Sequence, residues 1–178
     1  NSGLGVKREP FVVTWDPVTA EKGGYRHFML KEIHEQPQVI ADTFRGRIEP
    51  NAGRVLLDDV KLTQEELRAI TSVTIVACGT ALHAGLVTRF FIERLAKLPV
   101  SIDYGSEFRY RTPLLDKSSL FVVVSQSGET ADTLGSLGLA SELGVKTLAI
   151  CNVVGSSIAR KAGNVLYTHA GPEISVAS

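Results

Sequence analysis

The sequence is short of cysteine, of net charge and of long apolar runs, and each shortage excludes a class of protein. Only Cys78 and Cys151 occur among the 178 residues. Two thiols cannot form the disulfide framework of a small secreted domain, so we expect a reduced, cytoplasmic protein. Lys plus Arg equals Asp plus Glu at 19 each, so the formal net charge is zero. The chain therefore lacks the basic footprint of a nucleic-acid or anionic-membrane binder, and we expect neither partner.

Targeting, metal and cofactor motifs are missing as well. No run approaches about 18 apolar residues, and the N-terminus lacks a signal-peptide pattern, so we expect no membrane span. His27 and His34 are near each other but have no Cys-x-x-Cys beside them, which argues against a metal site. The nucleotide motif G-x-x-x-x-G-K and the dinucleotide motif G-x-G-x-x-G are both absent, and we expect no cofactor.

The two ends of the chain have the composition of cut ends. Residues 1–24 carry scattered glycine, proline and charge, as an interdomain linker does. The C-terminus stops at Ile174–Ser178 without a helix end or a closing strand. We therefore expect one domain over residues 25–178, with leading helices and a truncated C-terminal end, excised from a longer chain.

Helical patterns come first along the chain. Residues 26–44 repeat apolar side chains at helical spacing, and Pro37 is expected to bend or restart this helix. Its expected apolar face consists of Met29, Ile33, Ile40 and Phe44. Gly46 follows as a stop signal, and the stretch from Thr63 to Glu66 resembles a capping box.

Five β-branched apolar runs then alternate with helical patterns. The runs are Val73–Ala77, Val100–Tyr104, Leu120–Val124, Thr147–Cys151 and, more weakly, Val165–Thr168. Between the last two, Ser156 or Ser157 is a candidate N-cap of a short helix, and Gly144 stands where a helix C-cap belongs. Such alternation predicts an α/β fold of three layers, with a flavodoxin-like five-stranded parallel sheet flanked by helices.

The loop after the third run is rich in neutral hydrogen-bond donors. Ser125-Gln126-Ser127-Gly128-Glu129-Thr130 supplies three hydroxyls, one amide and one glycine directly before a helix. Hydroxyls and the unpaired amides of a helix N-terminus can together hold a phosphate, and Gly128 lets the backbone approach it. The same residues also suit an ordinary turn with an N-cap, and spacing alone leaves both interpretations open.

The loop after the first run, Cys78-Gly79-Thr80-Ala81, is the second candidate. Gly79 permits close approach, and Thr80 places a hydroxyl at a helix start. Cys78 is either a reactive thiol or a small buried core residue, and the core interpretation is favoured. His83 is either a ligand contact or, by preference, a residue that packs its helix.

The other polar candidates carry weaker signals. Glu107, Arg109 and Arg111 follow the second run, and a solvated ion-pair cluster is favoured over a ligand or partner contact. Asn152 suits an Asx turn, and Glu173 stands as a lone carboxylate. No serine–histidine–acid triad can be argued from the spacing, and neither candidate loop contains a lysine. Binding groups are plentiful and acid–base groups scarce, so we predict no catalytic residue in this chain.

Four motifs together resemble those of a known enzyme family. They are Ala77-Cys78-Gly79-Thr80, Ser125 through Thr133, Cys151-Asn152 with Gly155-Ser156-Ser157, and Glu173 through Ser178. Their order and spacing resemble the glutamine–fructose-6-phosphate aminotransferase family, and Tyr25 through Pro37 is similar to the stretch that joins its glutaminase and isomerase domains. The sheet resembles a sugar isomerase (SIS) domain, which the family carries twice in tandem.

The resemblance implies a set of binding residues. It assigns the substrate phosphate to Ser125, Gln126, Ser127 and Thr130. It assigns the sugar to the first loop, Cys78, Gly79, Thr80 and Ala81, and to Val176. The family often has serine at the position of Ala81, so one side-chain donor is missing here.

The resemblance also implies an activity for the parent enzyme. The family converts fructose 6-phosphate and glutamine to glucosamine 6-phosphate and glutamate, with its catalytic residues outside the matching segment. We therefore expect a fragment that binds fructose 6-phosphate or glucosamine 6-phosphate without turnover. The expected partners are a second copy in a homodimer, a glutaminase domain and a second SIS domain. A stand-alone SIS module that senses sugar phosphates is the alternative.

Overall fold

A computed structural model of the chain describes residues 21–176, which divide into two compact units. One unit comprises residues 21–36 and 171–176, and the other comprises residues 37–170. Most of the predicted linker, residues 1–20, lies outside the described residues. The predicted domain boundary at residue 25 stays a prediction.

Helix α1 spans Phe28–Phe44 and has residues in both units. It continues through Pro37 without a break, so the predicted restart at this proline does not occur. Gly46 follows the helix with a φ of +74°, as its predicted role as a stop signal requires. The predicted apolar face is not buried, because Met29, Ile33, Ile40 and Phe44 are each about half exposed.

A short hairpin and a short helix precede the main sheet. Strands β1 (Ile48–Glu49) and β2 (Arg54–Val55) pair antiparallel. They were not predicted, because two-residue strands carry no readable period. Helix α2 (Gln64–Arg68) opens with the predicted capping box: Thr63 accepts from the amide of Glu66, whose side chain accepts from the amide of Thr63.

The main sheet is parallel and five-stranded, as predicted. Its strands are β3 (Ser72–Ala77), β4 (Val100–Tyr104), β5 (Ser119–Ser125), β6 (Lys146–Cys151) and β7 (Asn164–Tyr167). Every boundary lies within one residue of the predicted one. The strand order β4-β3-β5-β6-β7 is the flavodoxin order, with β3 as the first strand in sequence and β4 outside it.

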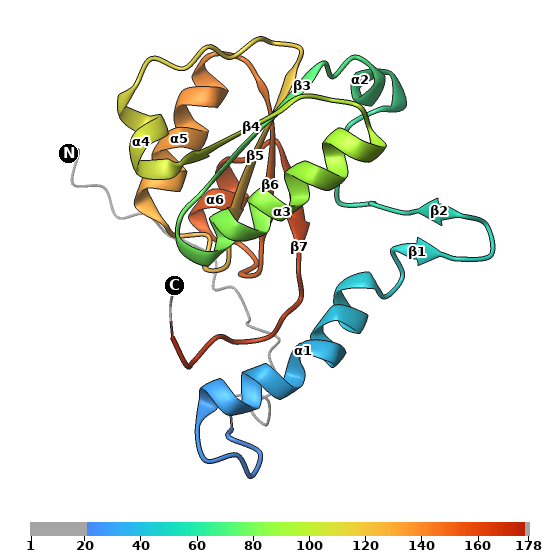
Figure 1. The fold of residues 1–178 in the computed structure, drawn as a ribbon, viewed down its shortest axis with the longest axis vertical. Coiled ribbons are helices and arrows are strands. Elements are labelled where there is room, and N and C mark those ends of the chain that lie inside the picture. Colours follow the sequence, from blue (N-terminus) through green and yellow to red (C-terminus); the bar gives the residue numbers. More distant parts are fainter. Residues whose placement is uncertain (1–20, 177–178) are drawn as a thin grey trace, which may run out of the picture. The chain divides into compact units, whose positions relative to one another are not determined.

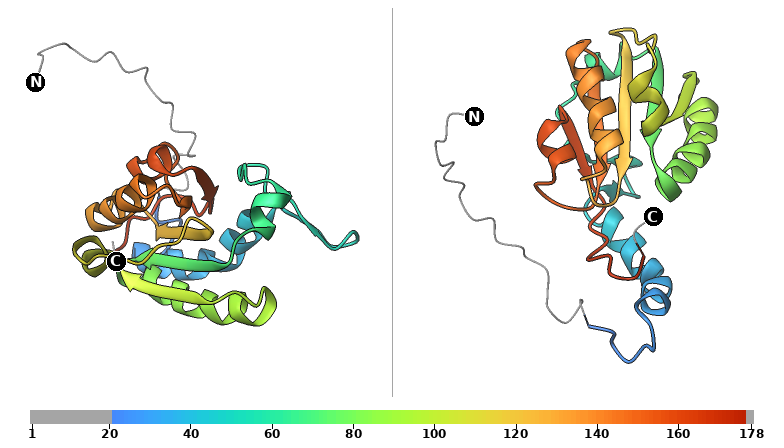
Figure 2. Two further views of the ribbon diagram at one scale, coloured as in Figure 1. Left: turned by 90° about the horizontal axis from the view of Figure 1, so that it is seen from above. Right: turned by 90° about the vertical axis from the view of Figure 1, so that its left-hand side faces the viewer.

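Helices cover both faces of this sheet. Helix α3 (Gly79–Leu95) lies on one face, and α4 (Gly105–Tyr110), α5 (Ala131–Glu142) and α6 (Ser157–Lys161) lie on the other (Figures 1 and 2). Helix α4 was missed, since it is one short turn-and-a-half that follows β4 without a break. Ser156 is the N-cap of α6 and Gly144 ends α5 with a φ of +72°, both as predicted.

The most deeply buried core lies on the face of the sheet that α4, α5 and α6 cover. Phe108, Leu137 and Ile158 are buried there against the sheet, and the ring centroids of Phe108 and Phe121 are 5.1 Å apart. Burying a side chain of this size contributes about 1.5–3 kcal/mol. These contacts fix α4, α5 and α6 on the strands, and so hold the loops at which α5 and α6 begin.

The α3 face is covered only in part by residues 21–176. An apolar hollow of about 270 Å³ lies beside α3 over β5 and β6, where Leu148 and Ile150 line it. Phe90, Phe91 and Leu95 of α3 are largely exposed. The α3 side of the sheet is therefore the more loosely packed layer.

Candidate functional site

The two candidate loops leave neighbouring strands at a topological switch point. From β3 the chain crosses through α3 to β4 on one side, whereas from β5 it crosses through α5 to β6 on the other. Ala77 at the end of β3 pairs with Val124 of β5, so the loops that follow begin side by side. In open α/β sheets, ligands bind in the crevice at the carboxyl ends of the strands where the order reverses.

The loop after β5 is organised by its own serines. Ser125 is buried, and its Oγ accepts a hydrogen bond from the amide of Gly128 at 3.1 Å. The same Oγ lies 3.2 Å from the Oγ1 of Thr130. The Oγ of Ser127 accepts from the amide of Glu129 at 3.2 Å. The hydroxyls of Ser125 and Thr130 therefore lie next to each other, and those of Ser125 and Ser127 hold the backbone of the loop.

Gly128 is the residue that this loop needs at its bend. Its φ is +66°, a conformation that glycine adopts readily and other residues rarely do. A Cβ at this position would lie 2.1 Å from the Oγ of Ser156. The loop thus lies directly against the connection between β6 and α6, and only glycine fits there.

Three helix N-termini at this edge, those of α3, α4 and α5, lack a side-chain cap. Cys78 is the N-cap of α3 and Thr130 is the N-cap of α5, and neither side chain bonds its own helix. At α6, by contrast, Ser156 accepts from the amide of Ala159. Amides in the first turn of a helix have no intrahelical partner, and the helix dipole favours an anion beside them. Two of the three uncapped helices, α3 and α5, follow the predicted loops, and α4 is the third.

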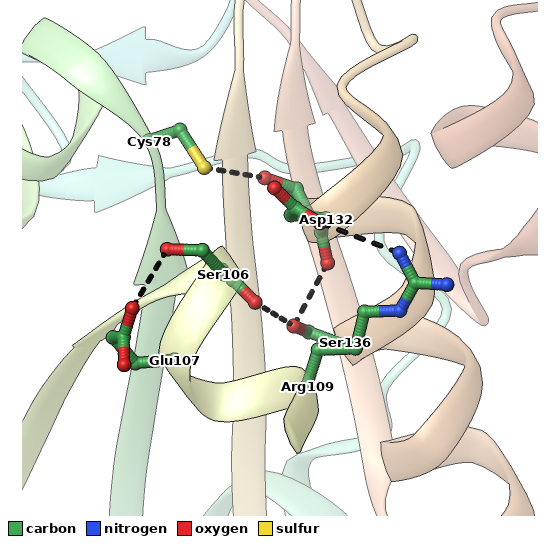
Figure 3. Close-up of polar contacts among 8 residues, drawn as sticks. Cys78, Ser106, Glu107, Arg109, Asp132 and Ser136 are labelled. Atoms are coloured by element: carbon green, nitrogen blue, oxygen red, sulfur yellow. Dashed lines mark hydrogen bonds and ion pairs between the residues drawn. The ribbon is translucent and has the colours of Figure 1, made fainter. Parts of the chain in front are cut away.

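Cys78 connects the first loop to the start of α5 (Figure 3). Its Sγ lies 3.6 Å from the Oγ1 of Thr133, in the first turn of α5. A Cβ added to Gly105 would lie 3.1 Å from this sulfur, so the backbone of α4 approaches it closely. Cys78 is half-buried, so the predicted core position is correct only in part.

The two arginines after β4 form ion pairs, so the favoured interpretation holds for them but not for Glu107. Arg109 lies 3.3 Å from the carboxylate of Asp132, at the start of α5 (Figure 3). Arg111 lies 2.5 Å from the carboxylate of Asp103. Glu107 accepts a hydrogen bond from the hydroxyl of its neighbour Ser106 at 3.3 Å. Both arginines are thus engaged within the chain, and neither candidate loop contains a cation.

Thr80 and Ala81 lie in the first turn of α3, where the sequence placed them. Thr80 is exposed and Ala81 is half-buried. His83 is exposed, so the prediction that it packs its helix is wrong. Its neighbour Leu82 is buried instead, so the side of α3 that carries His83 is turned away from the sheet, which explains the miss.

Asn152 has a larger role than the predicted Asx turn. It is buried, and its Oδ1 accepts from the amide of Ala170 at 2.7 Å and from the hydroxyl of Thr168 at 3.1 Å. The main-chain amide of Asn152 donates to the carbonyl of Gln126 at 3.1 Å. Asn152 therefore links the Ser125–Thr130 loop to the chain that leaves β7. These contacts join residues far apart in the sequence, so they could not be predicted from local spacing.

Comparison with known proteins adds a family to this geometry. The SIS domain model matches residues 66–178, which include the whole parallel sheet and both candidate loops. The chain belongs to the SIS domain family.

Relatives of this SIS chain extend the likeness beyond the sheet. It is 57% identical to a glutamine–fructose-6-phosphate aminotransferase of Symbiobacterium thermophilum and 55% identical to one of Clostridium tetani. Each alignment covers 99% of this chain but 29% of the relative, so the chain spans less than a third of these proteins.

A solved structure agrees with the sequence comparison. The C-terminal domain of glucosamine-fructose-6-phosphate aminotransferase from Francisella tularensis matches with a TM-score of 0.80 and 43% identity. The match covers 89% of this chain and 44% of that one. The SIS fold and the isomerase region to which the chain corresponds are therefore those that the motifs indicated.

Two groups at the carboxyl edge of the SIS sheet have shifted pKa values. Hydrogen bonds from the hydroxyl and the amide of Ser157 lower the pKa of Glu129, and the charge of Arg160 adds to the effect. Burial raises the pKa of the Cys151 thiol, although a contact with Ser156 opposes the shift. Glu129 is therefore ionised at neutral pH, whereas Cys151 stays protonated and is no nucleophile.

The smaller unit of the SIS chain holds its own polar cluster. Glu32 of α1 accepts from the amides of Ile174 and Ser175 at 2.9 and 3.1 Å, and from the hydroxyl of Ser175. Glu173 is not the lone carboxylate of the sequence analysis, because the charge of Glu32 acts on it. Val176 belongs to this unit and is exposed, and its role stays a prediction.

Neither a metal cluster nor a membrane-spanning helix is found among the described residues. Between residues 21 and 176, no group of three or more His, Cys, Asp or Glu side chains is placed to hold a metal ion. Over the same residues, no helix has the length and apolar character needed to cross a bilayer.

Proposed function

We propose that the carboxyl edge of β3 and β5 binds the phosphate of fructose 6-phosphate or glucosamine 6-phosphate. Ser125, Gln126, Ser127 and Thr130 hold the phosphate, together with the first amides of α5. The observation that carries the proposal is the uncapped N-terminus of α5 beside the adjacent hydroxyls of Ser125 and Thr130 at a switch point. Hydroxyls and main-chain amides at a helix start form an anion site without a cation.

The neutral character of the loop favours a small metabolite over a nucleotide. The loop after β5 contains no lysine or arginine, and Arg109 and Arg111 are paired with aspartates. Recognition therefore rests on directed hydrogen bonds, which hold a monoester in one orientation. The adjoining first loop then contacts the sugar through Cys78, Gly79, Thr80 and Ala81, and Val176 contributes a backbone contact.

For the parent protein we propose the activity of the relatives: conversion of fructose 6-phosphate and glutamine to glucosamine 6-phosphate and glutamate, in hexosamine synthesis. The chain supplies substrate binding to this cytoplasmic enzyme. A glutaminase domain, a second SIS domain and a second subunit supply the rest. The chain by itself binds without turnover.

A stand-alone sugar-phosphate sensor is the less favoured function. The SIS match begins at residue 66, yet the aminotransferases align over 99% of the chain. Residues before the sheet therefore share the likeness. An SIS module of another class has no reason to resemble an aminotransferase there.

Calorimetric titration of the chain tests the proposal. We expect fructose 6-phosphate and glucosamine 6-phosphate to bind, inorganic phosphate to bind more weakly, and unphosphorylated fructose to give no heat. Chemical-shift changes on adding the sugar phosphates should be largest at Ser125–Thr130. Absence of binding by both sugar phosphates, or equal binding of fructose, would contradict the phosphate site.

A further inference from the structure

The proposed phosphate loop contains a carboxylate, which is unexpected in a site for a dianion. Glu129 lies between Gly128 and Thr130, and its carboxyl is ionised at neutral pH. A negative charge facing the bound phosphate would oppose binding. The structure shows what this side chain does instead.

Glu129 reaches from the loop to the N-terminus of α6. Its Oε1 accepts a hydrogen bond from the amide of Ser157, the first residue of that helix, at 2.8 Å. A second contact runs parallel to it, from the amide of Ile158 to the carbonyl of Gly128 at 2.9 Å. Two consecutive amides of α6 thus hold two consecutive residues of the loop.

The surroundings of Ser157 favour a carboxylate at this place. The N-terminus of α6 has a partial positive charge, and Arg160 donates to the Oγ of Ser157 at 3.1 Å. Gly128 lies against Ser156, so the loop has no room to move closer. The carboxylate therefore occupies the start of α6, while the start of α5 keeps no side-chain cap.

We propose that Glu129 is a positioning residue, whose carboxylate fastens the loop Ser125–Thr130 to the N-terminus of α6 and so presents its hydroxyls and the start of α5 to the phosphate. The inference rests on the proposed function, because it assigns a role within the same site. It assigns Glu129 no contact with the substrate.

Ser157→Pro tests the contact, since it deletes both the amide and the hydroxyl that Glu129 accepts from and keeps the helix. Proline is well accepted at the first position of a helix and needs an extended residue before it. Ser156 has φ −60° and ψ 164°, which meets that need. The substitution removes the amide that Glu129 uses, and the contact between Ile158 and Gly128 remains.

Helix α2 offers a matched control. Gln64→Pro places proline at the same helical position, after Thr63 with φ −70° and ψ 162°. Among residues 21–176, no carboxylate accepts a hydrogen bond from the amide of Gln64. Ser157→Ala is the second control, because it removes the hydroxyl and keeps the amide.

We expect Ser157→Pro and Glu129→Ala each to weaken fructose 6-phosphate binding by about tenfold in calorimetry, the loss that one charge-assisted hydrogen bond accounts for. The double variant should lose no more affinity than either single variant, because both substitutions remove the same contact. The affinity for inorganic phosphate should fall by the same factor, because the lost interaction concerns the phosphate and not the sugar. Gln64→Pro should bind as the unaltered chain does, and Ser157→Ala should lose less than Ser157→Pro.

Several results would overturn the inference. If Glu129 merely faces the phosphate, Glu129→Gln and Glu129→Ala bind more tightly than the unaltered chain. Additive losses in the double variant exclude a shared contact. Should a proline variant fail to fold, Glu129→Gln still decides, since positioning requires weaker binding and repulsion requires tighter binding. Failure of the unaltered chain to bind sugar phosphates would overturn the proposed function, whereas unaffected variants of a binding chain overturn this inference alone.

Discussion

Glu32 and Ser175 are joined by two hydrogen bonds, from the amide and from the hydroxyl of the serine to one carboxylate. The amide of Ile174 donates a third. Three donors on one carboxylate hold the segment around Ile174 and Ser175. The neighbouring Glu173 carries a like charge, and its pKa responds to Glu32.

The pKa values of these two carboxyls are shifted in opposite directions. Burial acts to raise the pKa of Glu32, but the hydrogen bonds from Ser175 and Ile174, with the charge of Lys31, outweigh it and lower the pKa. Burial and the charge of Glu32 raise the pKa of Glu173. Glu32 therefore stabilises the fold above its unfolded pKa of about 4.3 and loses that contribution as the pH falls through its lower folded value. The ionised Glu173 carboxylate destabilises the fold, because desolvation and the charge of Glu32 both disfavour it. Its contribution therefore becomes less unfavourable as the pH falls and Glu173 is protonated.

Glu32→Gln tests this coupling by NMR titration of the side-chain carboxyl carbons. The substitution removes one charge, so we expect the pKa of Glu173 to fall towards its ordinary value and remain above it, because burial persists. Glu35→Gln is the control, since Glu35 pairs with Lys31 and does not act on Glu173. An unchanged Glu173 titration in Glu32→Gln would show that the two charges do not interact.

Removing single hydroxyls from the proposed phosphate site should weaken binding without unfolding the chain. We expect Ser127→Ala and Thr130→Ala each to reduce fructose 6-phosphate affinity by about one to two decades, since a hydrogen bond to a charged group contributes roughly 1.5–3 kcal/mol. Thr130→Ser keeps the hydroxyl and should bind nearly as the unaltered chain does. Unchanged affinity in both alanine variants would refute the assignment.

Gly128→Ala should be far more harmful than the same change at Gly155. Both glycines have a positive φ, which costs a non-glycine residue about 1–2 kcal/mol. At Gly155 a Cβ meets nothing within 4 Å, whereas at Gly128 it would overlap Ser156. Urea unfolding should therefore show a loss of about 1–2 kcal/mol for Gly155→Ala and a clearly larger loss for Gly128→Ala. Equal losses would mean that the contact with Ser156 relaxes freely.

Gly138→Ala, inside α5, should stabilise the chain. Alanine favours a helix interior over glycine by about 0.5–1 kcal/mol. The new Cβ would meet only the mobile end of the Lys161 side chain, 2.5 Å from its Nζ, which can swing away. At Gly135 the nearest atoms belong to Arg109, which is tied to Asp132, so Gly135→Ala should gain less. Thermal unfolding of the two variants provides the comparison, and a higher midpoint for Gly135→Ala would contradict it.

Apolar β-branched runs that alternate with helical patterns were enough to predict the sheet, and local signals predicted several helix ends. Within the run Leu120–Val124 the three central residues are buried, and the two end residues, which line the hollow on the α3 face, are half-buried. Thr63 and Ser156 were recognisable as N-caps, because a cap depends on residues within one turn. The missed elements, β1, β2 and α4, are too short to display a period.

The site was predictable in its residues but not in its supports. The hydroxyls of the Ser125–Thr130 loop can be read directly from the sequence. The partners of Glu129 and Asn152 cannot, since Ser157 and Ala170 approach them only through tertiary structure. A carboxylate within a run of neutral donors was the one available signal for Glu129. The position of Val176 relative to these loops stays a prediction.

The side-by-side start of the two candidate loops has a kinetic consequence. Strands β3 and β5 are neighbours in the sheet, yet α3, β4 and α4 separate them along the chain. A partly folded intermediate in which β3 and β5 are not yet paired does not bring the two candidate loops together. Such long-range pairings form slowly, because a long loop must close first. On dilution from denaturant, affinity for sugar phosphate should thus return together with the last cooperative step, after helical circular dichroism has already recovered.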